Sequence, residues 1–216
     1  MAAASPPPRR YAPRMAPERR REQLLDAALD LALERGFHAV TIDGVARAAG
    51  VTRPVVYGAF PDVSALLSAL VAREQGRALA GLLAALPPVP ADGADVDPDE
   101  LLVVGLTAFL TAVRDHPRTW RVMLLPPEGA PAELQDRLTT ERDAALHQLR
   151  GLTEWGLPRR PGGVALDPEL FARALQGLAE GAARLVLADP EAYPVERFTS
   201  FARGLLGALT IGSAPG

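Results

Sequence analysis

Residues 41–60 read Thr41-Ile-Asp-Gly-Val-Ala-Arg-Ala-Ala-Gly-Val-Thr-Arg-Pro-Val-Val-Tyr-Gly-Ala-Phe60, and this stretch decides how the chain folds. The pattern predicts two short helices, one opened by Thr41 and one opened by Thr52, joined by a turn at Gly50. Such helices pack at a steep angle only if the residue facing the crossing is small and the turn tolerates a left-handed backbone. Ala46 meets the first need and Gly50 the second.

The second helix has an apolar side and an outer side. The residues expected to form the apolar wedge are Val45, Val51, Val56 and Phe60. The outer side suits the major groove of DNA, where Arg53 can pair with a guanine, Val55 can touch a thymine methyl, and Thr52 can hold a phosphate. The full predicted DNA-binding set is Thr41, Arg47, Thr52, Arg53, Pro54, Val55, Tyr57 and Gly58. An ordinary helical hairpin is the alternative, because small residues are common at turns.

The rest of the chain also has a helical pattern, and prolines mark nearly every junction. No strand pattern or repeat is evident, so an all-α fold of about nine helices is expected. The further helices are predicted at roughly 17–35, 62–86, 99–115, 117–125, 131–155, 168–188 and 193–210. The predicted organisation is a disordered basic arm (1–16), a three-helix helix-turn-helix domain (17–62) and a larger helical ligand-binding and dimerisation domain (63–212).

Composition excludes several kinds of chemistry. The chain of 216 residues has no cysteine and no lysine, which rules out disulfides, cysteine-ligated metals and lysine Schiff bases. The formal net charge is -3, but residues 1–60 hold nine Arg against six acids while the remainder is acidic. No apolar run reaches membrane-spanning length and no signal peptide is evident, so a soluble, cytoplasmic protein without membrane contact is expected.

Catalysis is not expected. The three histidines, His38, His116 and His147, lie on separate elements without metal-ligand spacing, and no serine stands in a Gly-x-Ser-x-Gly elbow. No Gly-rich phosphate loop is present, and the carboxylates are spread over polar helix faces. We therefore predict no enzyme activity, no metal and no cofactor.

The ordered set of small, aromatic and polar positions over residues 18–70 resembles the amino-terminal region of the TetR family of bacterial transcriptional regulators. The matching residues are Arg35-Gly36-Phe37, Thr41, Val45-Ala46, Gly50-Val51-Thr52 and the run from Tyr57 to Leu67. The resemblance implies a three-helix DNA-binding domain, a helical body that dimerises and binds a small-molecule effector, and repression of a double-stranded DNA operator that the effector relieves. A ligand-binding or protein-interaction dimer of the same fold that has lost its grip on DNA is the alternative.

Two positions depart from the family pattern. The family often places a basic residue or His just before the Phe equivalent to Phe60, and a Lys three residues after it, and both hold DNA phosphates. This chain has Ala59 and Val63 instead. Loss of two phosphate contacts per subunit should weaken DNA binding and flatten its salt dependence. The arginines that precede the motif are a candidate substitute: Arg9, Arg10, Arg14, Arg19, Arg20 and Arg21.

The carboxy-terminal body should supply the homodimer interface and the effector pocket. Two apolar stripes, which equally suit the subunit's own core, are predicted at the interface: Phe171, Ala174, Leu175, Leu178, Ala182, Leu185, Phe198, Phe201, Ala202, Leu205 and Leu209. The pocket is expected to take a small, fairly apolar ligand, although a plain core explains the same aromatics. Its predicted residues are Phe109, Val113, His116, Trp120, Arg121, Met123, Leu124, Leu146, His147 and Trp155.

Overall fold

All regular structure in the described residues of this computed structural model is helical. The structure describes residues 15–85, 96–124, 132–160 and 166–211. Within them, the expected all-α fold of nine α-helices is confirmed, with two short 3-10 turns at Phe37–Ala39 and Leu157–Arg159. The helices are α1 (Pro17–Arg35), α2 (Ile42–Ala48), α3 (Arg53–Tyr57), α4 (Val63–Ala85), α5 (Pro98–Asp115), α6 (Pro117–Leu124), α7 (Ala132–Gly156), α8 (Pro168–Ala188) and α9 (Val195–Ile211).

Local signals explain where these helices begin and end. Proline stands at the first turn of α1, α3, α5 and α8, where its missing N–H removes no intrahelical hydrogen bond. The Thr41 hydroxyl accepts a hydrogen bond from the Gly44 amide at 2.9 Å and so caps α2. Gly50 has a φ of 66°, the left-handed conformation that the turn requires. The predicted disordered arm lies outside the described residues, apart from Met15 and Ala16.

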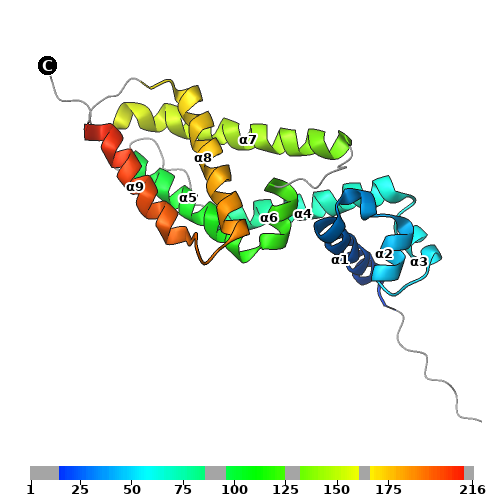
Figure 1. Cartoon of the computed structure of the whole chain (residues 1–216). Helices are drawn as coiled ribbons and strands as arrows, with labels where there is room; N and C mark the ends of the chain where they lie inside the picture. Colours follow the sequence, from blue (N-terminus) through cyan, green and yellow to red (C-terminus); the bar gives the residue numbers. More distant parts are fainter. Residues whose placement is uncertain (1–14, 86–95, 125–131, 161–165, 212–216) are drawn as a thin grey trace, which may run out of the picture.

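The helices α1 to α3 gather at one end of the molecule, and α5, α7, α8 and α9 form the body at the other end (Figure 1). Helix α4 runs from the first group into the body, and α6 packs against α4, α5 and α8. In the body, α5 packs against both α8 and α9, and α7 packs against α8. No helix in the described part of the chain is long and apolar enough to span a bilayer.

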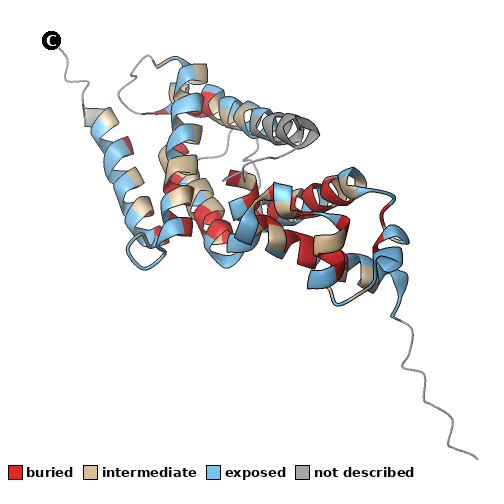
Figure 2. Cartoon of the chain, turned by 45° about the vertical axis from the view of Figure 1, so that its right-hand side comes forward, coloured by how far each residue is buried: buried red, intermediate tan, exposed pale blue. Residues whose placement is uncertain are grey.

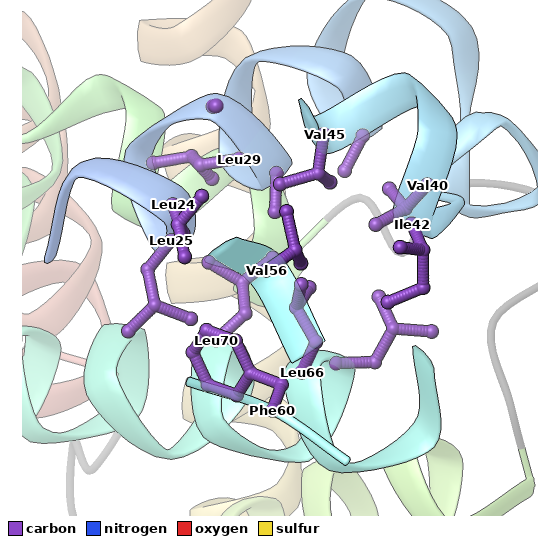
Figure 3. Packing of buried hydrophobic residues seen from close by; sticks show 14 of the residues in the cluster. Leu24, Leu25, Leu29, Val40, Ile42, Val45, Val56, Phe60, Leu66 and Leu70 are labelled. Atoms are coloured by element: carbon purple, nitrogen blue, oxygen red, sulfur yellow. The ribbon is translucent and has the colours of Figure 1, made fainter. Parts of the chain in front are cut away.

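The first of two hydrophobic cores joins α1, α2, α3 and the beginning of α4 (Figure 3). Val45, Val56, Phe60 and Leu70 are almost completely buried in it. The predicted boundary between the two domains, at residues 62 and 63, therefore falls just before a helix whose first turns complete the amino-terminal core. The second core is built by α5, α6 and α8 with Val195 of α9 and Ala78 of α4, so α4 contributes to both.

Candidate functional site

The turn between α2 and α3 is held by its own backbone. The amide of Val51 donates to the carbonyl oxygen of Ala46 at 2.9 Å, and the amide of Gly50 donates to the carbonyl oxygen of Arg47 at 3.2 Å. These two bonds close the end of α2 around the left-handed Gly50. Val45 and Val56 then meet in the first core, which fixes α3 with one side buried and one side outward.

All eight residues of the predicted DNA-binding set are exposed. Tyr57 is 55% exposed and Val55 is 37% exposed, high fractions for large side chains on a packed domain. Thr52 stands at the N-cap position of α3, but its side chain makes no capping hydrogen bond. The outer side of α3 is thus a short surface of mixed polar and apolar groups. The other exposed members of the set are Thr41, Arg47, Arg53, Pro54 and Gly58.

One carboxylate that no sequence pattern singles out lies against Arg53. Asp43, in the first turn of α2, forms an ion pair with the Arg53 guanidinium across the two helices. Both side chains remain largely exposed. The ion pair therefore holds the guanidinium at the start of α3 while leaving it open to solvent. The ten-residue separation matches no local helical spacing, so only the tertiary structure identifies Asp43.

The two positions that depart from the family pattern contribute to packing. Ala59 and Val63 are half-buried and lie against the first core. Neither side chain can carry charge, so neither can hold a phosphate through an ion pair.

A charged cluster around the buried Glu74 joins α1 to α4 and α6. Glu74 of α4 is fully buried, and its Oε1 atom accepts from Arg73 Nε at 2.9 Å and Arg77 Nη1 at 3.2 Å. Its Oε2 atom accepts from the Thr119 hydroxyl of α6 at 2.6 Å. Arg73 Nη1 also lies 2.8 Å from Asp26 Oδ1 and 3.1 Å from Glu22 Oε2 of α1. This cluster of residues 22, 26, 73, 74, 77 and 119 connects α1, α4 and α6.

Burial by itself lowers the pKa of Arg73, since it penalises the charged form. The neighbouring Glu74, Asp26 and Glu22 outweigh that effect and leave the pKa of Arg73 above its ordinary value. Arg73 therefore stays charged inside the cluster. A second link between α1 and α6 is the ion pair of Asp30 with Arg118.

The ten predicted pocket residues do not line one cavity in the described structure. Val113, Trp120 and Leu124 are buried in the second core, with Phe109 and Met123 packed against it. Phe109 and Trp120 meet edge to face, with ring centroids 5.1 Å apart. Leu146 is half-buried, and His116, Arg121 and His147 are exposed. Arg121 donates to the carbonyl oxygen of Leu187 at 3.2 Å.

Trp155 lies elsewhere, at a cleft of about 270 Å³, open solvent included, between α5, α7 and α8. Leu101, Leu152, Arg160 and Phe171 also line this cleft. Arg160 forms an ion pair there with Asp99, with 2.7 Å between Arg160 Nε and Asp99 Oδ1. Its Nη2 atom donates to the carbonyl oxygen of Leu206 at 2.9 Å. The indole Nε1 atoms of Trp120 and Trp155 are buried without a hydrogen-bond partner in the described structure. The effector site stays a prediction.

Helices α8 and α9 are largely exposed along their outward sides (Figure 2), and several of the exposed residues are apolar. Phe201 is 62% exposed and Leu178 is 55% exposed, and Leu185 and Leu205 are also exposed. Leu170 is also exposed but was not among the predicted interface residues. It lies one helical turn before Ala174 and two turns before Leu178, so the same helical spacing would have identified it. We call Leu170, Ala174, Leu178, Leu185, Phe201 and Leu205 the α8–α9 face.

The remaining predicted interface residues face inward to different degrees. Ala182 is buried in the second core, and Phe198 packs against that core and stacks with Tyr193. Phe171, Leu175, Ala202 and Leu209 are half-buried. Glycines accompany the exposed positions: a Cβ atom added at Gly177, Gly181, Gly204 or Gly207 would meet no neighbouring atom of the chain. These glycines therefore leave open space beside the exposed apolar residues of both helices.

Comparisons with known proteins agree with this architecture. The family model described as "Bacterial regulatory proteins, tetR family" matches residues 24–70, which span most of α1 through the first turns of α4. An uncharacterized HTH-type transcriptional regulator of Mycobacterium tuberculosis is 33% identical over 110 residues, which cover 50% of this chain and 52% of the relative. The HTH-type transcriptional activator FasR of Mycolicibacterium smegmatis is 37% identical over 73 residues, 34% of this chain and 33% of FasR.

The chain spans between about a third and three fifths of the length of the curated relatives that it matches. A solved structure extends the likeness to the whole fold. The TetR-like transcriptional regulator from Rhodococcus sp. RHA1 superposes with a TM-score of 0.70 at 28% identity, covering 90% of this chain and 100% of that one. The family-model match identifies residues 24–70 as a domain of the TetR family of bacterial regulatory proteins, and the superposition shows that the whole chain shares the fold of a TetR-like transcriptional regulator.

Proposed function

We propose that this protein is a DNA-binding transcriptional regulator that represses its target until a small apolar effector releases it from a double-stranded operator. The observation that carries the proposal is the orientation of α3. Its inner side is locked into the first core by Val56, while its outer side presents Arg53, Val55 and Tyr57 to solvent. A helix held in this way by a second helix matches the geometry that reads base edges in the major groove.

We expect Arg53→Ala to weaken binding to the DNA upstream of the protein's own gene by at least about fivefold, because a bidentate base contact contributes about 1–3 kcal/mol. Gel shifts at two salt concentrations measure the effect. Arg114→Ala is the matched control, since Arg114 is an exposed arginine on α5 that pairs with an acid, as Arg53 does. Equal affinities of the two variants would count against base recognition by Arg53.

A second candidate function is a dimer of the same fold that no longer binds DNA. Ala59 and Val63 favour this second candidate. Both pack against the first core, and neither supplies a cation at the DNA-facing end. The same gel shift decides between the candidates. If the wild-type chain binds the DNA upstream of its own gene, and binds it more weakly as the salt concentration rises, the result supports the proposed role as a DNA-binding regulator.

The regulator would act as a homodimer. Two α3 helices must reach successive major grooves about 34 Å apart, which a two-fold axis through the α8–α9 face would allow. Exposed apolar side chains on that face support this assignment, and the bare glycines would permit close helix approach. The relative FasR is named a transcriptional activator. A reporter gene measured with and without the protein tests the direction of regulation in this chain.

The effector site is proposed at the second core, around Trp120. A buried indole N–H without a hydrogen-bond partner costs about 1–3 kcal/mol, which a hydrogen-bond acceptor on the effector would offset. The aromatic edge of Phe109 and the buried Val113 and Leu124 would favour an apolar body. These features support a small, apolar effector with one acceptor group.

This proposal predicts an effect on tryptophan fluorescence. The chain has two tryptophans, so Trp155→Phe leaves Trp120 as the only indole. We expect compounds with a carbonyl group, such as acetophenone, to shift Trp120 emission more than their hydrocarbon counterparts, such as ethylbenzene. A screen of such matched pairs measures the preference. Binding that ignores the carbonyl would argue against an acceptor at Trp120.

Coupling between the proposed effector site and the DNA-binding helix α3 would pass along α4. This helix belongs to both cores and is tied through Glu74 to α6 and through Arg73 to α1. An effector that favours a different position of α4 would change the separation of the two α3 helices. A hundredfold release requires the effector to prefer the non-binding conformation by about 2.7 kcal/mol.

A further inference from the structure

The first turns of α1 brace the ends of both helices of the helix-turn-helix. Gln23 Nε2 donates to the carbonyl oxygen of Ala49 at 3.0 Å, just after α2. Arg21 Nη1 donates to the carbonyl oxygen of Ala59 at 2.9 Å, just after α3. The Arg21 guanidinium also lies over the buried ring of Phe60, with its Cζ atom 4.3 Å from the ring centroid. A cation on α1 is therefore held at the end of α3.

Arg21 is held in place without being neutralised. No carboxylate pairs with it among the residues that the structure describes, whereas Arg53, Arg73 and Arg77 each pair with an acid. One contact to a carbonyl oxygen uses a single N–H of a guanidinium that has five. The side chain is exposed, so the rest of its N–H donors are accessible from solvent.

We propose that Arg21 contacts a DNA backbone phosphate at the edge of the groove that α3 enters. A fixed, planar guanidinium suits phosphate oxygens because its N–H groups match them in pairs, and less conformational freedom is lost when it binds. Its place beside Ala59 puts the charge where the chain's own residues 59 and 63 supply none. The contact comes from an ordered residue of α1, and it rests on the proposed DNA-binding function.

Salt dependence separates a phosphate contact from a packing role. The full-length chain is used with a fluorescein-labelled duplex that wild-type protein selects from a random-sequence library. Arg21→Gln removes the charge, and Arg21→Met also removes it but keeps an unbranched stem over Phe60, in case the Gln variant is unstable. Arg21→Lys keeps the positive charge but lacks the paired N–H groups of the guanidinium. Arg35→Gln is the matched control, because it removes one exposed charge from the opposite end of α1.

We expect the slope of log K against log salt to become shallower by about 1.8 in the neutral variants, since each of two subunits loses one contact of about 0.9. Between 50 and 200 mM salt, the wild type would therefore lose roughly twelvefold more affinity than the neutral variants. Arg21→Lys should restore most of the wild-type slope, and Arg35→Gln should leave it unchanged.

A purely structural Arg21 would lower the melting temperature of the Gln, Met and Lys variants and leave the slope at the wild-type value. That result overturns the inference and leaves the proposed function intact. A wild-type chain that selects no duplex overturns the proposed function, and the inference falls with it.

Discussion

Replacing Glu74 with alanine is expected to lower the free energy of unfolding by about 3 kcal/mol, the lower end of the range for removing one partner of a buried ion pair. Glu74 is fully buried, and its loss leaves the Thr119 hydroxyl without its acceptor and Arg73 with only its partners on α1. Those remaining partners, and the half-exposed position of Arg77, keep the expected loss from being larger. Urea unfolding of the full-length chain measures the change.

Two further variants divide the effect of Glu74 into its parts. Thr119→Val keeps the side-chain shape and removes one hydrogen bond to the carboxylate, so a loss of about 1–3 kcal/mol is expected. Glu22→Gln removes a largely exposed partner of Arg73, so a loss below about 1 kcal/mol is expected. If Glu74→Ala unfolds at the same urea concentration and with the same slope as the wild type, the charged cluster around Glu74 does not stabilise the junction of α1, α4 and α6.

Placing a charge on the α8–α9 face should have the larger effect on function. We expect Phe201→Asp, combined with Leu178→Asp, to convert the proposed dimer into a monomer of 22.9 kDa. Each subunit would then bury two unpaired carboxylates at the interface, where like charges from the partner would also meet them. Light scattering during gel filtration measures the mass.

The same double variant should bind operator DNA at least about a hundredfold more weakly, because two linked half-site contacts become independent. Both side chains are mostly exposed in the single chain, so helix content by circular dichroism should be unchanged. Val96→Asp is the control, since Val96 is an exposed apolar side chain that precedes α5 and belongs to neither α8 nor α9. A double variant that stays dimeric would move the interface to another surface.

Much of the fold was predictable because its signals are local. Proline at the first turns, Thr41 as a cap and Gly50 at the turn act within a few residues, and the structure places helix boundaries within about two residues of those expected from them. The helical period predicts that Val56 faces inward while Val55 and Tyr57 face outward. The structure agrees, because Val56 is buried and the other two residues are exposed.

Helical periodicity was less informative in the body. It places apolar residues on stripes, but it does not say whether a stripe meets its own core or a second chain. Ala182 turned out to be buried while Leu178, one turn earlier, is exposed, although the sequence assigned both to the interface. The predicted pocket residues show the same ambiguity, since Phe109, Val113, Trp120 and Leu124 fill the second core and Trp155 lies at a separate cleft.

The sequence by itself therefore determined the nine helices, the helix-turn-helix and the outward side of α3, because caps, turns and helical periods depend on neighbouring residues. Only the tertiary structure decided which distant groups meet. Arg21 reaches Ala59 across 38 positions, Glu74 reaches Thr119 across 45, and Asp43 turns to Arg53 across the turn at Gly50. Such contacts depend on how α1, α4 and α6 pack together, and no local pattern of residues specifies that packing.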